Sequence, residues 1–164
     1  MTSVLRKFRG VGVVAALIAG LALSACANKQ GSDSLASAGV ATPGSQQDFV
    51  VNVGDRVFFE SDSTELTGTS RSTLDKQAQW LQQYGNYTFT IEGHADERGT
   101  REYNLALGAR RAAATRDFLV SKGVASSRLK TISYGKERPV AVCDDISCWS
   151  QNRRAVTTLS GAGS

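Results

Sequence analysis

The segment from Tyr87 to Ala112 constrains the fold more than any other part of the chain. Apolar and polar residues alternate from 87 to 92, which is the pattern of a β-strand with one buried face. A loop at 93–100 then places four ionisable side chains between two glycines, and a helix is predicted from about 100 to 122. A loop between a strand and a helix is held still by both, and such loops often carry function. The segment therefore predicts an α/β fold and the place of a functional site.

Three further strands and one further helix are predicted around this segment. The strands are expected at 57–59, 129–134 and 155–159, and the helix at 69–84, where Gly85 ends it. Strands that alternate with helices of this length predict an α/β two-layer sandwich. We expect a small mixed β-sheet with two main helices on one face and a βαβαβ core. Residues 48–159 are long enough for one domain with a single core.

The N-terminal residues have the features of a lipoprotein signal peptide, predicted at 1–25. Three cations at residues 6–9 precede an apolar run at 11–23, and Leu23-Ser24-Ala25-Cys26 resembles a bacterial lipobox, in which lipid is attached to the cysteine. The alternative is a transmembrane anchor, but the apolar run is shorter than the ~20 residues that a spanning helix needs. By resemblance to other lipoproteins, Ala27 in place of Asp favours the outer membrane.

Residues 26–47 are rich in Gly, Ser and Ala and have no periodic apolar face, so they predict a flexible tether. A short frayed tail is predicted at 160–164. The formal charge of +4 includes three cations of the signal peptide, which leaves +4 − 3 = +1 on the mature chain. A charge this small does not indicate a nucleic-acid partner.

Cys143 and Cys148 are the cysteines that remain once Cys26 is assigned to lipid. In an oxidising periplasm, two cysteines so close in a loop favour a small disulfide. Two free thiols, or half of a metal site, are the alternatives. A four-ligand zinc site would need two more ligands, and His94 is the only histidine of the chain.

One arginine of the predicted second helix lies at the edge of an apolar face. On a helical wheel Arg111 falls on the arc that should face the sheet, whereas Arg110 falls outside it. A guanidinium placed there needs a partner, because an unpaired charge away from water is very costly. Asp96 is a candidate partner, and a purely structural salt bridge is one interpretation of the pair. The other apolar-arc residues are Leu107, Thr115, Phe118 and Leu119.

The residues GHADERGT…YN…LG..RRA resemble the OmpA-like peptidoglycan-binding family, in particular its branch of peptidoglycan-associated lipoproteins. In that family the Asp of G-H-x-D and the Arg of L-x-x-x-R-A hold the diaminopimelate of the peptidoglycan stem peptide. The resemblance assigns these roles to Asp96 and Arg111. A carboxylate can take the ammonium of diaminopimelate, and a guanidinium can hold its carboxylate through two hydrogen bonds. Asp62 matches a further ligand-contacting position, although Ser61 replaces an aromatic residue that often precedes it.

Other residues of the motif are expected to support the site. His94 is expected to donate a hydrogen bond that shapes the loop, and Gly93 and Gly99 to permit backbone turns. Tyr103 and Asn104 match a family Tyr-Asn pair that is expected to brace the loop. Arg153 and Arg154 resemble the family's C-terminal N-R-R segment. They are either a solvated pair or a support for the binding loop that can contact peptidoglycan carboxylates.

The resemblance implies an outer-membrane lipoprotein that binds peptidoglycan and meets the periplasmic Tol proteins, chiefly TolB, during envelope constriction. No cofactor and no reaction are expected. One alternative is a wall-anchoring lipoprotein without Tol partners. Another is a metal-dependent wall hydrolase built on His94, Asp96 and Glu97. No serine or cysteine lies in a recognisable nucleophile motif, and no Gly-rich loop has the form that phosphate binding requires.

Overall fold

The computed structural model describes residues 41–161. The predicted signal peptide, the lipid site Cys26 and most of the predicted tether lie outside the described residues, as do residues 162–164.

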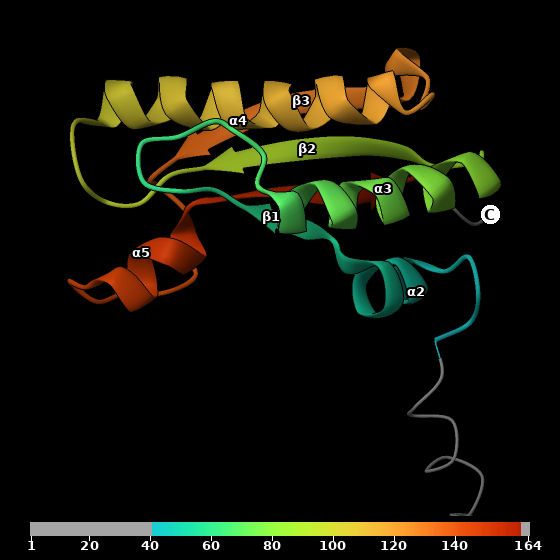
Figure 1. The fold of residues 1–164 in the computed structure, drawn as a ribbon, viewed down its shortest axis with the longest axis horizontal. Helices are drawn as coiled ribbons and strands as arrows, with labels where there is room; N and C mark the ends of the chain where they lie inside the picture. Colours follow the sequence, from blue (N-terminus) through green and yellow to red (C-terminus); the bar gives the residue numbers. More distant parts are fainter. Residues whose placement is uncertain (1–40, 162–164) are drawn as a thin grey trace, which may run out of the picture. The chain divides into compact units, whose positions relative to one another are not determined.

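The sheet has four strands in the order β1 (Arg56–Phe58), β4 (Arg154–Ser160), β2 (Thr88–His94) and β3 (Leu129–Gly135) (Figure 1). Strand β4 is antiparallel to both of its neighbours, and β2 is parallel to β3. Parallel neighbours need a crossover connection, which α4 (Arg101–Ser121) supplies. The predicted mixed sheet is confirmed.

Two helices, α3 (Gly68–Gln83) and α4, cover one face of the sheet, as predicted. Threonines start both helices: the side chains of Thr67 and Thr100 accept hydrogen bonds from the backbone two or three residues into the helix. The alternating strand residues Phe89 and Ile91 are buried beneath them. A short 3-10 turn (Ser126–Arg128) leads into β3. The rest of the core comes from β1, α3, α4 and β4 and includes Val57, Leu74, Ala78, Leu81, Ala112, Leu119 and Ala155.

The ordered domain begins earlier in the chain than predicted. A short helix α2 (Gln46–Asp48) continues into a π-helical turn η1 (Phe49–Gly54), neither of which the sequence patterns indicated. Phe49 is fully buried against the ring of Trp80, whose indole N–H donates to Asp48 at 2.8 Å. The hydroxyl of Tyr87 donates to the carbonyl of Gly44. Contacts with the domain thus begin a few residues before the predicted tether boundary at 47, because the Tyr87 hydroxyl holds Gly44.

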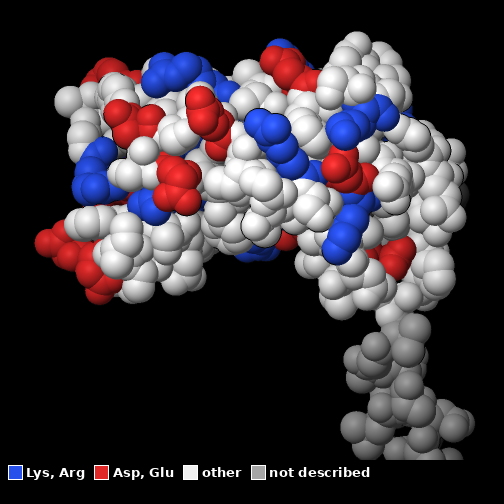
Figure 2. Space-filling model, in the orientation of Figure 1, with Lys and Arg blue, Asp and Glu red and all other residues white. Residues whose placement is uncertain are grey.

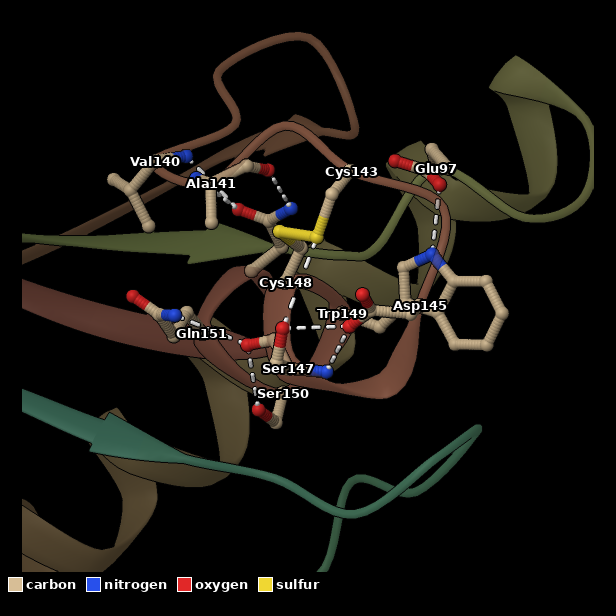
Figure 3. The surroundings of a disulfide bond; sticks show 11 residues. Glu97, Val140, Ala141, Cys143, Asp145, Ser147, Cys148, Trp149, Ser150 and Gln151 are labelled. Atoms are coloured by element: carbon tan, nitrogen blue, oxygen red, sulfur yellow. Dashed lines mark hydrogen bonds between the residues drawn. A yellow bond between two sulfur atoms is a disulfide. The ribbon is translucent and has the colours of Figure 1, made fainter.

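A further helix, α5 (Ile146–Asn152), was also not predicted. It begins at Asp145, whose side chain accepts from the backbone of Ser147. The predicted disulfide between Cys143 and Cys148 is confirmed and joins α5 to the loop before it (Figure 3). The side chain of Asn152 holds the same loop through hydrogen bonds with the backbone of residues 140–141. The segment between β3 and β4 is thus a braced unit.

Acidic and basic side chains are interspersed on the face drawn in Figure 2, without a large patch of either sign. Among residues 41–161, no helix has both the length and the apolar character needed to span a membrane.

The strand β2 and the helix α4 touch through two glycines. A Cβ atom added to Gly93 would lie 1.8 Å from the carbonyl oxygen of Gly108. A Cβ atom on Gly108 would in turn meet the carbonyl oxygen of Gly93 at 2.8 Å. Gly93 does not have a positive φ, so the expectation that it permits a turn is wrong. Its lack of a side chain instead lets α4 approach the sheet where β2 enters the loop.

We therefore predict that Gly93→Ala destabilises the domain. The added methyl group meets backbone, which cannot rotate away, and overpacking of this kind costs about 1–3 kcal/mol. The free energy of unfolding in urea would measure the loss. Gly68→Ala is the control, because a Cβ atom at Gly68 meets nothing within 4 Å. Equal stability of Gly93→Ala and the wild type would contradict the close approach.

Candidate functional site

The loop between β2 and α4 is held in one shape by its own residues. Gly99 has a φ of +86°, the left-handed conformation that glycine adopts without strain, as predicted. The side chain of Asn104 is almost completely buried and donates to the carbonyls of Arg98 and Thr100, at 2.7 and 3.1 Å. The prediction that Asn104 braces the loop is confirmed.

Asp96 lies at the centre of a network of two arginines. Its carboxylate accepts hydrogen bonds from the backbone and the guanidinium of Arg98, the shortest at 2.7 Å. Nη1 of Arg153 lies 3.5 Å from the same carboxylate. Burial raises the pKa of Asp96, but the hydrogen bonds and charge of Arg98 outweigh it and hold this pKa below its usual value. Asp96 is therefore ionised at neutral pH.

Arg111 faces the sheet as predicted, but its partners are backbone carbonyls. Its guanidinium donates to the carbonyls of Glu60, Ser63 and His94 at 2.9–3.1 Å, and it lies over the ring of Phe59. The side chain has no exposed surface, and this burial lowers the pKa of Arg111 to about 10, so it stays charged at neutral pH. The interpretation of Asp96 and Arg111 as a structural salt bridge is therefore wrong, because three carbonyl oxygens accept from the Arg111 guanidinium instead.

Asp62 follows the segment that Arg111 holds. It has a φ of +53°, which is uncommon outside glycine and marks a strained loop residue. Its carboxylate accepts a hydrogen bond from the hydroxyl of Tyr103. Tyr103 therefore contacts Asp62, and the prediction that Tyr103 braces the loop is wrong.

A cavity of about 290 Å³ joins these groups. Asp62 and Asp96, to which the family resemblance assigns ligand contacts, both line it, whereas Arg111 does not. Arg98 contributes a half-exposed guanidinium, which also donates to Ser61 at 2.8 Å. Two carboxylates and one guanidinium suit a ligand that carries an ammonium group beside a carboxylate. The complete lining is Ser61, Asp62, Asp96, Arg98, Gly99, Tyr103, Asn104 and Leu107.

The helix α5 supports this cavity from outside. The guanidinium of Arg98 stacks on Trp149 at 4.3 Å, and the Trp149 indole donates to Glu97 at 2.7 Å (Figure 3). Trp149 was not predicted as a site residue, because α5 itself was not predicted. Asp145 directly before Ile146, with Trp149 three residues later, is the pattern of a capped helix with one apolar side.

His94 does not have the predicted role. Its ring is buried beside Tyr134, and neither ring nitrogen has a hydrogen-bond partner among the described residues. Burial and the positive charges of Arg154 and Arg138 lower the pKa of His94 to about 4, so the ring is neutral at pH 7. The prediction that the His94 ring donates a hydrogen bond to the loop is therefore wrong. The backbone carbonyl of His94 contributes to the site instead, by accepting a hydrogen bond from Arg111.

Arg153 and Arg154 are both buried, so the interpretation as a solvated pair is wrong. Arg153 donates to the carbonyl of Phe59 at 3.0 Å and approaches Asp96, which makes it a support of the loop. Arg154 lies nearer to the sheet and donates to the carbonyl of Arg138 at 3.1 Å.

Comparison with known proteins gives relatives over almost the whole length of the chain. A peptidoglycan-associated lipoprotein of Mesorhizobium japonicum is 71% identical over 93% of this chain and 94% of the relative. One of Rhizobium meliloti is 69% identical over 93% of this chain and 89% of the relative. The crystal structure of the peptidoglycan-associated lipoprotein from Burkholderia pseudomallei is 40% identical, with a TM-score of 0.63 over 65% of this chain and 90% of that one.

The family match covers the same part of the molecule as the site. Residues 58–153 match the OmpA family, a range that begins at the end of β1 and closes at Arg153. It includes every residue that lines the cavity. The chain therefore belongs to the OmpA family.

Proposed function

We propose that this protein is an outer-membrane lipoprotein that binds peptidoglycan non-covalently and ties the outer membrane to the cell wall. The names of its relatives support this function, since they are peptidoglycan-associated lipoproteins at up to 71% identity. The observation that carries the proposal is the cavity that places Asp62, Asp96 and Arg98 together. Its ligand is the diaminopimelate of the stem peptide.

The charges of the cavity match the free end of diaminopimelate, which carries an ammonium and a carboxylate. The carboxylates of Asp62 and Asp96 take the ammonium, and Arg98 takes the carboxylate. Nε and Nη2 of Arg98 are bonded to Asp96 and Ser61, which leaves the N–H groups of Nη1 for the ligand.

Arg111 is the residue to which the family resemblance assigns the ligand carboxylate. Three of its five N–H groups are bonded to carbonyls, and the side chain is not exposed. Because the side chain is buried, residues around it, such as the segment 60–63 that it holds, would have to move before a ligand reached its remaining N–H groups. We therefore propose that Arg111 acts first by holding that segment, and with it Asp62, at the cavity.

The lipid on Cys26 would hold the domain at the outer membrane and leave it free in the periplasm. The proposal extends to a system of Tol partners, with TolB as the main one, that acts in envelope integrity and cell division. An OmpA-like anchor without Tol partners is the alternative within this class. Co-purification of TolB with the protein from cross-linked cells would separate the two.

A wall hydrolase built on His94, Asp96 and Glu97 is less favoured. The three side chains have different partners: Tyr134 beside His94, Arg98 on Asp96, and Trp149 on Glu97. Within residues 41–161, no group of three or more His, Cys, Asp or Glu side chains could hold a metal ion. Release of muropeptides from purified sacculi by the metal-loaded protein would support the hydrolase and contradict a passive anchor.

We predict that Asp96→Ala abolishes most binding to sacculi that contain diaminopimelate. Loss of a charge-assisted contact to a partly desolvated ligand costs roughly 2–5 kcal/mol, which is about 30- to several-thousand-fold in affinity. Co-sedimentation with purified sacculi measures the change, and thermal melting shows whether the variant is folded.

Three matched variants locate the guanidinium that binds. Arg98→Ala should weaken sacculus binding strongly, and Arg110→Ala should not, because Arg110 is exposed and outside the cavity. Arg111→Lys should lower the melting temperature, since a compact ammonium cannot reproduce the planar guanidinium whose three nitrogens each reach a different carbonyl. The assignment to Arg98 fails if Arg98→Ala binds normally. The whole proposal fails if folded Asp96→Ala binds like the wild type and still prefers diaminopimelate walls to lysine-type walls.

We also predict that Cys26→Ala releases the protein from the outer-membrane fraction. Two or three acyl chains hold a protein on a membrane stably, whereas the variant has no acylation site. Cell fractionation and the intact mass of the mature protein check this. Wild-type protein that is soluble in the periplasm, without the added mass of lipid, would refute the anchor.

A further inference from the structure

A second cavity, of about 400 Å³, lies between the end of β1 and α5. Arg153 lines it, and Nη1 of Arg153 is 3.5 Å from the Asp96 carboxylate, which lines the first cavity. The two cavities are therefore neighbours across a single Asp–Arg contact. The lining residues are Phe58, Phe59, Glu60, Thr67, Ser150, Gln151 and Arg153.

Arg153 has donor groups that residues 41–161 do not use. Its side chain is 4% exposed, and its Nε donates to the carbonyl of Phe59. Nη1 makes only the long contact with Asp96, and Nη2 has no hydrogen bond to any residue from 41 to 161. A guanidinium this deeply buried gains stability from every acceptor that reaches its N–H groups. Because Arg153 lines the second cavity, an acceptor that enters this cavity comes beside the Arg153 side chain.

The other polar groups of this cavity offer weaker donors. Thr67 caps α3, and the side chains of Ser150 and Gln151 both donate to the carbonyl of Ser147. Glu60 is exposed, so its negative charge is solvated at the rim, and half-exposed Phe58 forms an apolar wall. The cavity therefore fits a single carboxylate on a short apolar stem, bound by Arg153.

We propose that the second cavity binds the free carboxylate of the stem-peptide residue that precedes diaminopimelate. That residue is a γ-linked glutamate, whose α-carboxylate remains unbonded in the peptide. This assignment rests on the proposed function, in which the diaminopimelate end occupies the first cavity. One stem peptide then spans both cavities, with an ammonium and a carboxylate in the first and a second carboxylate at Arg153.

Three ligands test the second cavity by calorimetry with the full-length protein in detergent micelles. They are meso-diaminopimelate, the tripeptide L-Ala-γ-D-Glu-meso-diaminopimelate, and the same tripeptide with the glutamate α-carboxylate converted to an amide. The acidic tripeptide forms a hydrogen bond between charged groups that the amide lacks. We therefore expect the acid to bind about 10- to 100-fold more tightly than the amide. The amide should bind about as well as diaminopimelate alone.

Two variants assign the effect to this cavity. Arg153→Gln should remove the difference in affinity between the acid and the amide tripeptides. Because Arg153 also supports the loop, Glu60→Gln is the second variant: it removes a nearby negative charge from an exposed side chain and should tighten the acid but not the amide.

The possible failures are distinguishable. If diaminopimelate binds and the acid and amide tripeptides bind alike, the second cavity is not a carboxylate site, and the proposed function stands. If none of the three ligands binds, the diaminopimelate function fails, and the second cavity fails with it.

Discussion

The site depends on one buried guanidinium. Arg111 comes from α4 and bonds carbonyls at Glu60, Ser63 and His94, which belong to two segments more than thirty residues apart in sequence. Its removal would take a donor from all three carbonyls, and a buried carbonyl left without a partner, such as that of His94, costs about 1–3 kcal/mol. Because these carbonyls flank Asp62 on one side and Asp96 on the other, the same side chain sets the distance between the two carboxylates of the cavity.

Other contacts position the remaining parts of the cavity around Arg111. Gly93 and Gly108 let α4 lie against β2, so that the loop between them starts at the sheet surface. The Asp96 carboxylate then orders Arg98, and Trp149 supports Arg98 from the opposite side. Trp149 belongs to a helix held by a disulfide and an N-cap, so the rim of the cavity is preorganised before any ligand arrives.

The sequence predicted the layers of the fold because these follow from periodicity. The alternation around Phe89 and the spacing of Leu107 and Arg111 on α4 are local signals, and the structure buries these residues as expected. The membership of Asp62 and Asp96 in one site followed from the family resemblance.

The partners of the charged residues could not be predicted in the same way. The sequence shows that Arg111 needs an acceptor. It does not show which one, because every residue has a backbone carbonyl and the side-chain pattern does not indicate that residues 60–63 fold next to Arg111. Arg98 lies two residues from Asp96 in the loop and forms the ion pair with it. The Asp96 carboxylate, which was the candidate partner of Arg111, is therefore already paired. The start of the domain was misplaced for a related reason: Gly44 and Asp48 are held by Tyr87 and Trp80, which lie far along the chain.

The central claim is that the cavity of Asp62, Asp96 and Arg98 binds the zwitterionic end of diaminopimelate. NMR titration of the isotopically labelled protein with meso-diaminopimelate tests it most directly, with lysine as the control that has an ammonium but no carboxylate at that end. We expect saturable chemical-shift changes at residues 61–62, 96–99 and 103–104 with meso-diaminopimelate, and much weaker changes with lysine. Equal responses to both ligands, or changes confined to residues outside the cavity, would contradict it.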